Sequence, residues 1–198
     1  PTASLKAPSF RVAVLDNGLT VYVLDSSAVQ SPIVQVELIT LGGAAADPVD
    51  QAGLTLLSYL STYHGGGKWQ GRGLQRRLTQ ISAGLDVDVQ PDHGRITVLA
   101  PARNMQQATL LLAALVRQPY LHAPSFDRLK TLVEERGTVK TADPMEHARH
   151  ILGPLTFGRV HPYGRKLTGT KASMANISAQ LVEQIGRASC RERVCSVV

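Results

Sequence analysis

Residues 10–24 read FRVAVLDNGLTVYVL, which is two alternating runs of apolar residues around Asp16-Asn17-Gly18. Such alternation indicates strands, and Asn-Gly between two of them signals a hairpin because both central positions of that tight turn favour positive φ. A third run, from Ile33 to Leu41, follows Ser31-Pro32 and ends at Gly42-Gly43. The chain is therefore expected to open with three short strands.

The spacing of apolar residues becomes helical after residue 50. It predicts helices over residues 50–64, which three glycines end, and over 73–82. Alternation returns on both sides of Pro91-Asp92-His93-Gly94 and predicts a second hairpin, with strands at 85–90 and 95–100. Further helices are expected over 104–117, 125–139 and 144–155. Because strands and helices are segregated, the sequence predicts an α+β fold with a largely antiparallel sheet covered by helices on one face.

The bulk composition is that of an ordinary globular chain. Its 198 residues suit one domain or slightly more, with 43% hydrophobic and 18% charged residues. No apolar run approaches the roughly 20 residues that span a membrane, and because the sequence opens with Pro1, any signal peptide is expected to lie outside it. The net charge of +6 comes without a Lys/Arg-rich block, so no nucleic-acid partner is expected.

The last segment, residues 185–198, differs sharply from the rest. It contains both cysteines, Cys190 and Cys195, and its run IGRASCRERVC resembles the translation of a sequencing-adapter oligonucleotide. We therefore expect an adapter-derived artefact there, and the cysteines are not interpreted as a disulfide or a metal pair. Without its three arginines and one glutamate, the net charge falls from +6 to +4. The natural protein is then expected to continue past about Gln184 into other sequence.

Several motifs together resemble the insulinase/pitrilysin metallopeptidases, the family that includes the mitochondrial processing peptidase subunits. The match begins with the hairpin Leu15 to Val21, which follows the family pattern L-x-N-G-L-x-V. It continues in the same order over roughly residues 10 to 184. The further matching motifs are Gly42-Gly43, Asp47-Pro48, Gln51-Ala52-Gly53-Leu54, Pro119-Tyr120, Phe157, His161-Pro162-Tyr163-Gly164 and Gly169-Thr170.

The resemblance fails at the catalytic motif. Active members carry H-x-x-E-H on the helix that begins at the Gly-Leu pair, where two histidines bind zinc and the glutamate activates the zinc-bound water. Here the histidine positions are Leu56 and Leu60, and the glutamate position is Tyr59. A shift by one residue in either direction does not restore the motif. The degenerate positions Leu56, Tyr59 and Leu60 therefore predict no catalytic residue, no metal site and no cofactor in this chain.

The third zinc ligand of active relatives is a glutamate on a later helix. Glu134, Glu135 and Arg136 occupy that neighbourhood. Because a lone carboxylate cannot hold zinc, Glu134 and Glu135 are leftover candidates that are more simply explained as solvated helix charges.

The segment His161-Pro162-Tyr163-Gly164-Arg165 corresponds, by the resemblance, to the link between two domains near the inner chamber. The simpler interpretation is a rigid turn fixed by Pro162 and Gly164, with Tyr163 packed as an anchor. The implied domain division is a zinc-less N-terminal domain over 1–160 and, over 161–184, a linker with the start of a truncated following domain.

Three other groups of residues give weaker evidence for a functional site. His147 and His150 could share a helix face, but two histidines without a third ligand typically form a surface or hydrogen-bonded pair. His64 lies at a helix end, where a histidine meets the helix dipole favourably. Gly65-Gly66-Gly67-Lys68 lacks the spacing and the Ser/Thr of a phosphate-binding loop.

By resemblance, then, the chain is expected to be the non-catalytic half or subunit of a zinc metallopeptidase. It would form part of a peptide-enclosing chamber and support an active partner that carries H-x-x-E-H and the zinc. The peptide substrate is expected to be an indirect partner, because cleavage occurs on the active half. In the chamber it would be held in part by addition to a sheet edge and in part by charge. The alternatives are a free-standing structural or binding pseudopeptidase and an independently active zinc peptidase. A bacterial periplasm or cell envelope is the expected location.

Overall fold

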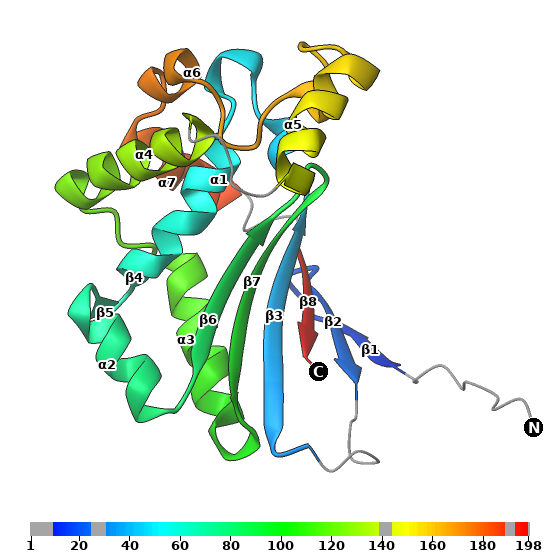
Figure 1. The fold of residues 1–198 in the computed structure, drawn as a ribbon. Coiled ribbons are helices and arrows are strands. Elements are labelled where there is room, and N and C mark those ends of the chain that lie inside the picture. Colours follow the sequence, from blue (N-terminus) through cyan, green and yellow to red (C-terminus); the bar gives the residue numbers. More distant parts are fainter. Residues whose placement is uncertain (1–9, 25–30, 139–143, 189–192, 198) are drawn as a thin grey trace, which may run out of the picture.

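The computed structural model describes the backbone of residues 10–24, 31–138, 144–188 and 193–197, and the side chains of most of them up to residue 183. Six strands of the described chain form one sheet in the order β1-β2-β8-β3-β7-β6. Its strands are β1 (Phe10–Val14), β2 (Thr20–Leu24), β3 (Ile33–Leu41), β6 (Gly84–Val89), β7 (His93–Pro101) and β8 (Arg193–Val197). Figure 1 shows this sheet with the helices gathered to one side of it.

The sheet is largely antiparallel. Each of β1–β2, β3–β7, β6–β7 and β3–β8 is an antiparallel pair, whereas β8 runs parallel to β2. A separate short hairpin joins β4 (Gly65–Gly66) to β5 (Trp69–Gln70). The predicted α+β class, with helices on one face of a mostly antiparallel sheet, is thus confirmed.

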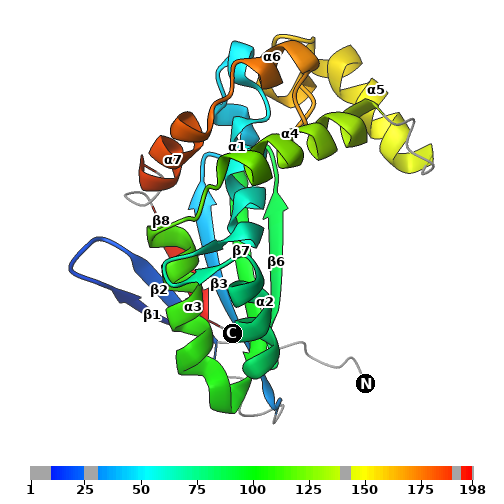
Figure 2. The same cartoon turned by 90° about the vertical axis from the view of Figure 1, so that its left-hand side faces the viewer.

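Helices α1 and α3 pack on the sheet, and α2 lies beside them on the same side (Figure 2). None of the described helices is long and apolar enough to cross a bilayer. In chain order the helices are α1 (Leu54–Leu60), α2 (Arg72–Gln80), α3 (Met105–Arg117), α4 (Ala123–Thr138), α5 (Pro144–Phe157), α6 (Lys171–Ala175) and α7 (Ala179–Ala188).

The main core lies between the sheet and the helices. Alternate residues of β3 and β7 point toward the helices, because side chains alternate between the faces of a strand. A second cluster joins α1 and α4 to the segment around α6 and α7, through Leu54, Leu57, Phe126, Val133, Met174, Ile177 and Val182. A third cluster joins α2 to α3 through Leu74, Leu78, Ile81, Leu111 and Leu115.

The first hairpin forms where predicted, but with a different turn. Gly18 has φ +81°, whereas Asn17 keeps a negative φ, so the expectation of positive φ at both positions was wrong. The backbone N–H of Leu15 donates to the carbonyl of Leu19, and the N–H of Leu19 donates to Oδ1 of Asn17. The Leu15–Leu19 hydrogen bond therefore closes a three-residue loop, Asp16 to Gly18. Such a loop needs left-handed backbone only at its last residue.

The helix predicted over 50–64 is divided into shorter pieces. Gly53 has φ +98°, so the α-helix begins only at Leu54, after a 3-10 turn at Val49–Gln51. It passes into a second 3-10 turn at Ser61–His64, and Gly65 with φ +108° ends it.

The end of the chain contains elements that the apolar spacing did not predict, namely α6, α7 and β8. Met174 and Ile177 of this region pack in one cluster with α1 and α4. Residues 193–197, within the adapter-like segment, lie between β2 and β3. The boundaries at 160 and 184 and the origin of residues 185–198 stay predictions.

Candidate functional site

The candidate site is built around the N-terminal end of α1. Asp47 is only 5% exposed. It precedes the helix in the sequence, and its carboxylate caps the N-terminal end of the helix. Oδ2 accepts the N–H of Gly53 at 3.0 Å, and Oδ1 accepts the N–H and the hydroxyl of Thr55 at 3.1 and 2.6 Å. These bonds satisfy donors that the first turn of a helix leaves free. The Asp47-Pro48 motif therefore fixes where α1 begins.

Burial raises the pKa of the Asp47 carboxyl above its ordinary value of 3.8, although the hydrogen bonds from Thr55 and Gly53 and the charge of Arg165 act in the opposite direction. Desolvation penalises the charged form, and here it outweighs the donors that favour that form. The capping role of Asp47 was missed in the sequence, where only its match to a motif was noted.

The three positions of the zinc motif point into packed apolar surroundings. Leu56 is partly buried and packs against both the main core and the α1–α4 cluster. Leu60 packs against the α1–α4 cluster, and Tyr59 is 7% exposed within the main core. The face of α1 that would hold a cation in an active relative thus presents aliphatic carbon and a phenol.

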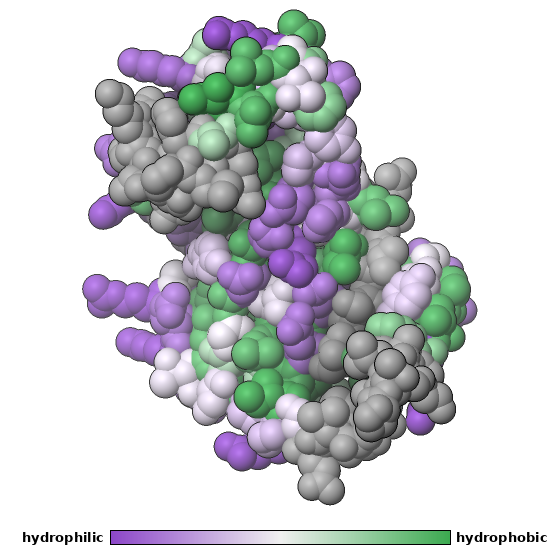
Figure 3. Space-filling view, turned by 45° about the vertical axis from the view of Figure 1, so that its right-hand side comes forward, coloured by the Kyte–Doolittle hydropathy of each residue, from purple (hydrophilic) through white to green (hydrophobic). Residues whose placement is uncertain are grey.

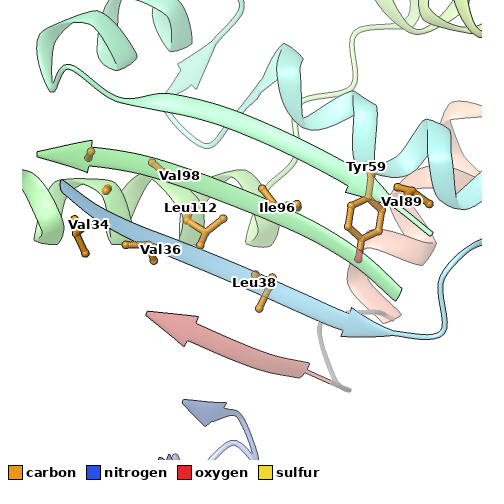
Figure 4. Close-up of a cluster of buried hydrophobic side chains, with 10 residues drawn as sticks. Val34, Val36, Leu38, Tyr59, Val89, Ile96, Val98 and Leu112 are labelled. Carbon is orange, nitrogen blue, oxygen red and sulfur yellow. The ribbon is translucent and has the colours of Figure 1, made fainter. Parts of the chain in front are cut away.

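Tyr59 reaches from α1 across the sheet, as Figure 4 shows. Its hydroxyl contacts the hydroxyl of Thr40 on β3. Its ring covers Gly94 on β7 so closely that a Cβ at position 94 would overlap the ring. A glycine opposite the aromatic ring is therefore required, and Tyr59 serves as a core residue with its polar end satisfied.

Glu134 and Glu135 lie on α4 near its C-terminal end. The apolar side of α4 faces α1 through Phe126 and Val133. Glu134 is half-buried and Glu135 is exposed, and both line a depression of about 430 Å³ together with Lys166 and Lys171. The two carboxylates therefore share their surroundings with cationic and hydroxyl groups.

The residues present do not fit a zinc ion. Leu56 and Leu60 offer no lone pair, and zinc sites in proteins use thiolate, imidazole or carboxylate ligands. Across the described part of the chain, no three His, Cys, Asp or Glu side chains converge as a metal site. The side chains of Arg136, His147 and His150 lie outside what the structure describes, so the histidine-pair hypothesis stays a prediction.

The segment His161 to Arg165 forms a 3-10 turn at Pro162–Gly164. Nδ1 of His161 accepts the N–H of Tyr163 at 3.3 Å. The His161 ring stacks with the rings of Phe157 and Tyr163, and those two rings are tilted with respect to each other. The Tyr163 hydroxyl donates to Asp92 at the tip of the β6–β7 hairpin, and this bond raises the Tyr163 pKa. The turn itself is as expected, but Tyr163 is 41% exposed, so its ring contacts and its hydroxyl bond hold it and not burial in a core. A role of this segment in a chamber stays a prediction.

Arg165 ties this turn to the loop before α1. Its Nη1 donates to the carbonyl of Asp47 at 2.8 Å and its Nη2 to the carbonyl of Ala45 at 3.3 Å. Gly164 is buried and lies against the carbonyl of Gly158, which leaves no space for a Cβ. The turn is thus fixed on both sides and positions the loop that carries the Asp47 cap.

The sheet face away from the helices carries a polar network that the sequence did not reveal. Glu37 is buried there and accepts bonds from Gln35 at 2.9 Å and Thr97 at 3.0 Å. Arg95 lies 3.8 Å from Glu37 and 3.2 Å from Asp88. Only the register of β3, β7 and β6 brings these residues together. Figure 3 shows hydrophilic areas between hydrophobic ones on one face of the molecule.

The architecture is that of M16 peptidase domains. The structure superposes on a protease from Helicobacter pylori with a TM-score of 0.85 at 14% identity, covering 96% of this chain and 46% of that one. An M16 peptidase inactive domain from Pseudomonas fluorescens matches with a TM-score of 0.83 at 18% identity, covering 96% of this chain and 46% of that one.

Pitrilysin matches with a TM-score of 0.79 at 17% identity, covering 98% of this chain and 21% of that one. The chain thus spans less than half the length of each of these three solved proteins. No family model matches the sequence, and no curated protein matches it either. At these identities the likeness shows the fold.

Proposed function

We propose that this chain is the non-catalytic half or subunit of an M16-type zinc metallopeptidase. It forms part of the wall of a peptide-enclosing chamber and supports an active partner that carries H-x-x-E-H and the zinc. The observation that carries the proposal is the packing of Leu56, Tyr59 and Leu60 into the apolar core of a fold that M16 domains share.

The packing supports a permanent loss of the metal site. Each zinc-motif position has partners of its own. Tyr59 contacts Thr40 and covers Gly94, Leu56 packs against two core clusters, and Leu60 packs against the α1–α4 cluster. The comparison with a solved M16 inactive domain supports the same interpretation. The described side chains form no group that could hold a metal ion, so the proposal assigns peptide cleavage to the partner.

The uncovered face of the sheet supports the role as a chamber wall. On this face Glu37 and Thr97 are buried and hydrogen-bonded to each other, and the more exposed Arg95 joins Glu37 to Asp88. The described sheet also has two edge strands, β1 and β6, and an extended peptide can add to such an edge through its backbone. We further propose a bacterial periplasm or cell envelope as the location. The chain upstream of residue 185 contains no cysteine, and this composition is compatible with such a compartment.

The test is reconstitution with a catalytic half. The chain is co-expressed with an M16 half that carries H-x-x-E-H, the complex is isolated through a tag on this chain, and cleavage of a quenched fluorescent peptide is measured. We expect cleavage by the complex and none by this chain alone. A complex whose partner has its H-x-x-E-H glutamate changed to glutamine is the control, and it should bind without cleaving.

Two outcomes would reject the proposal. If the catalytic half cleaves equally well without this chain, the supporting role is wrong; if no such half associates with it, the free-standing pseudopeptidase is favoured. Separately, metal analysis that finds one zinc per purified chain would show that residues other than Leu56 and Leu60 form a zinc site, and it would favour an independently active peptidase.

A further inference from the structure

The segment from Gly65 to Leu85 carries positive charge and no negative charge. It contains the β4–β5 hairpin and α2, and its charged residues are Lys68, Arg72, Arg76 and Arg77. Helix α3 and the 3-10 turn before it contain two arginines and likewise no Asp or Glu. A hairpin and two helices therefore carry cations without a carboxylate of their own.

The fold places these cations on one side of the molecule. Side chains of α2 and α3 pack together in the third core cluster, and Nη2 of Arg77 donates to Oε1 of Gln107 on α3 at 3.0 Å. Nδ2 of Asn104 donates to the carbonyl of Ile81 at 2.9 Å, so Arg103 lies beside the C-terminal end of α2. Figure 2 shows the two helices side by side in front of the sheet. We define the α2–α3 surface by the exposed or half-buried residues Lys68, Trp69, Arg72, Arg76, Arg103 and Leu110.

The positions of Arg72 and Arg76 are unfavourable for α2 itself. Arg72 is the first residue of the helix, where a cation opposes the helix dipole, and the first turn contains no acidic residue. Arg76 follows four residues later, and like charges at this spacing repel each other. Among the described residues, neither side chain forms an ion pair. The two arginines therefore suit an anionic partner outside the chain better than a stabilising role within it.

Apolar side chains lie among these cations. Nζ of Lys68 is 4.9 Å from the centre of the Trp69 ring, and Cζ of Arg77 is 5.6 Å from it. The Trp69 ring is half-buried against the cluster that joins α2 to α3. On α3, Leu110 is 57% exposed and Met105 is 47% exposed. Lysine, arginine and tryptophan beside exposed aliphatic side chains are typical of protein surfaces that lie on a membrane.

We propose that the α2–α3 surface binds anionic phospholipids at the surface of a membrane. The basic side chains contact the lipid phosphates, while Trp69 and Leu110 contact the boundary between headgroups and acyl chains. A nucleic acid fits less well, because binding to single strands uses several aromatic rings for stacking, and Trp69 is the one Phe, Tyr or Trp between residues 64 and 119. This inference does not depend on the proposed peptidase function, and it involves no residue of the adapter-like segment.

Co-sedimentation of the whole chain with lipid vesicles tests the proposal. Vesicles of phosphatidylcholine alone are compared with vesicles that contain about one third phosphatidylglycerol, and we expect binding to the anionic vesicles to be at least about tenfold tighter. Arg72→Gln/Arg76→Gln should weaken that binding about 25-fold, because each basic residue near an anionic membrane contributes about fivefold in affinity.

The matched control is Arg159→Gln/Lys171→Gln, which removes the same charge from exposed residues of other parts of the chain. It should change binding by less than about twofold, since charges far from the contact are screened by salt. Equal losses in the two double variants would overturn the proposal, and so would equal binding to the two kinds of vesicle.

The fluorescence of Trp69 gives a second measurement that needs no variant, because it is the only tryptophan of the chain. Anionic lipids with brominated acyl chains should quench this fluorescence, and high salt should restore it by screening the charges. Absence of quenching would overturn the proposed contact. A short DNA duplex that binds where anionic vesicles do not, with the same dependence on Arg72 and Arg76, would also overturn it and identify a nucleic-acid site.

Discussion

Asp47 shows how one buried side chain determines where a helix begins. Its carboxylate accepts the N–H groups of Gly53 and Thr55, and its backbone carbonyl accepts Arg165. The cap, the left-handed Gly53 and the turn that follows His161 therefore meet at one point. Loss of the carboxylate removes the acceptor of three donors: the N–H of Gly53 and the N–H and hydroxyl of Thr55.

We predict that Asp47→Ala lowers the free energy of unfolding by about 2–3 kcal/mol, because a lost cap and unsatisfied buried donors each cost about 1–2 kcal/mol. Urea unfolding at neutral pH measures it. Asp50→Ala is the matched control: Asp50 is exposed and only its backbone carbonyl accepts a bond, from Asn176, so its loss should change little. An equal effect of both substitutions would contradict the capping role.

The raised pKa of Asp47 also predicts a pH dependence. Because the folded chain holds this proton more tightly than the unfolded chain, the stability from Asp47 is fully present below pH 3.8 and declines as the pH rises through the raised pKa. The loss of stability in Asp47→Ala should therefore be larger at acidic pH than at neutral pH. Unfolding curves of both proteins across this range check the sign.

His64 is expected to show the opposite trend. Burial lowers the pKa of its imidazole below the ordinary 6.5, although a backbone hydrogen bond from its ring to Ser61 raises it. Desolvation thus outweighs the hydrogen bond, and the predicted benefit from the helix dipole stays a prediction. Stability from His64 is present above pH 6.5 and is lost as the pH falls, so His64→Gln should flatten the decline of stability below that pH. Unfolding measured at several acidic pH values tests this, and an unchanged slope would contradict it.

At the scale of elements, the sequence revealed each strand of the β1–β3 and β6–β7 groups because one face of each is apolar. Leu56 and Leu60 can also be read directly at the positions that the resemblance assigns to the zinc motif, and the loss of a zinc site stays a prediction. The sequence did not reveal the Glu37–Arg95 network, because that contact depends on the register between strands far apart in the chain. Strand β8 was not predicted for a different reason: residues 193–197 belong to the segment interpreted as an adapter-derived artefact, which was left out of the fold prediction.

The contact between α1 and β7 gives a prediction at this scale. We expect Gly94→Ala to lower the free energy of unfolding by about 2 kcal/mol, since the new Cβ would overlap the ring of Tyr59 and overpacking costs about 1–3 kcal/mol. Gly84→Ala on the edge strand β6 is the control, because its Cβ would meet open space. Thermal unfolding compares the two.

The cause of that loss can be isolated with a double substitution. In Gly94→Ala/Tyr59→Leu the smaller side chain leaves room for the methyl group, so the combined destabilisation should be less than the sum of the single effects. Strict additivity would mean that Gly94 is needed for its backbone and not for the tyrosine.

For the whole molecule, the second core cluster joins residues from distant parts of the chain. Met174 is fully buried among residues of α1 and α4. We predict that Met174→Ala destabilises the entire fold by about 2–4 kcal/mol, as for other large-to-small core changes, with one unfolding transition. Exposed Met105, changed to Ala, is the control. Two separate transitions in calorimetry would instead show that residues 161–184 unfold as a unit of their own.

The position of β8 in the middle of the sheet has a consequence for biosynthesis. A ribosome releases residues 10–24 long before residues 193–197, yet the two segments are neighbours in the sheet. Until the later segment emerges, the edge of β2 that pairs with residues 194–197 in the finished sheet has no strand beside it. The nascent hairpin must therefore wait for most of translation, and this interval is the time in which a chaperone would be needed to keep it from aggregating.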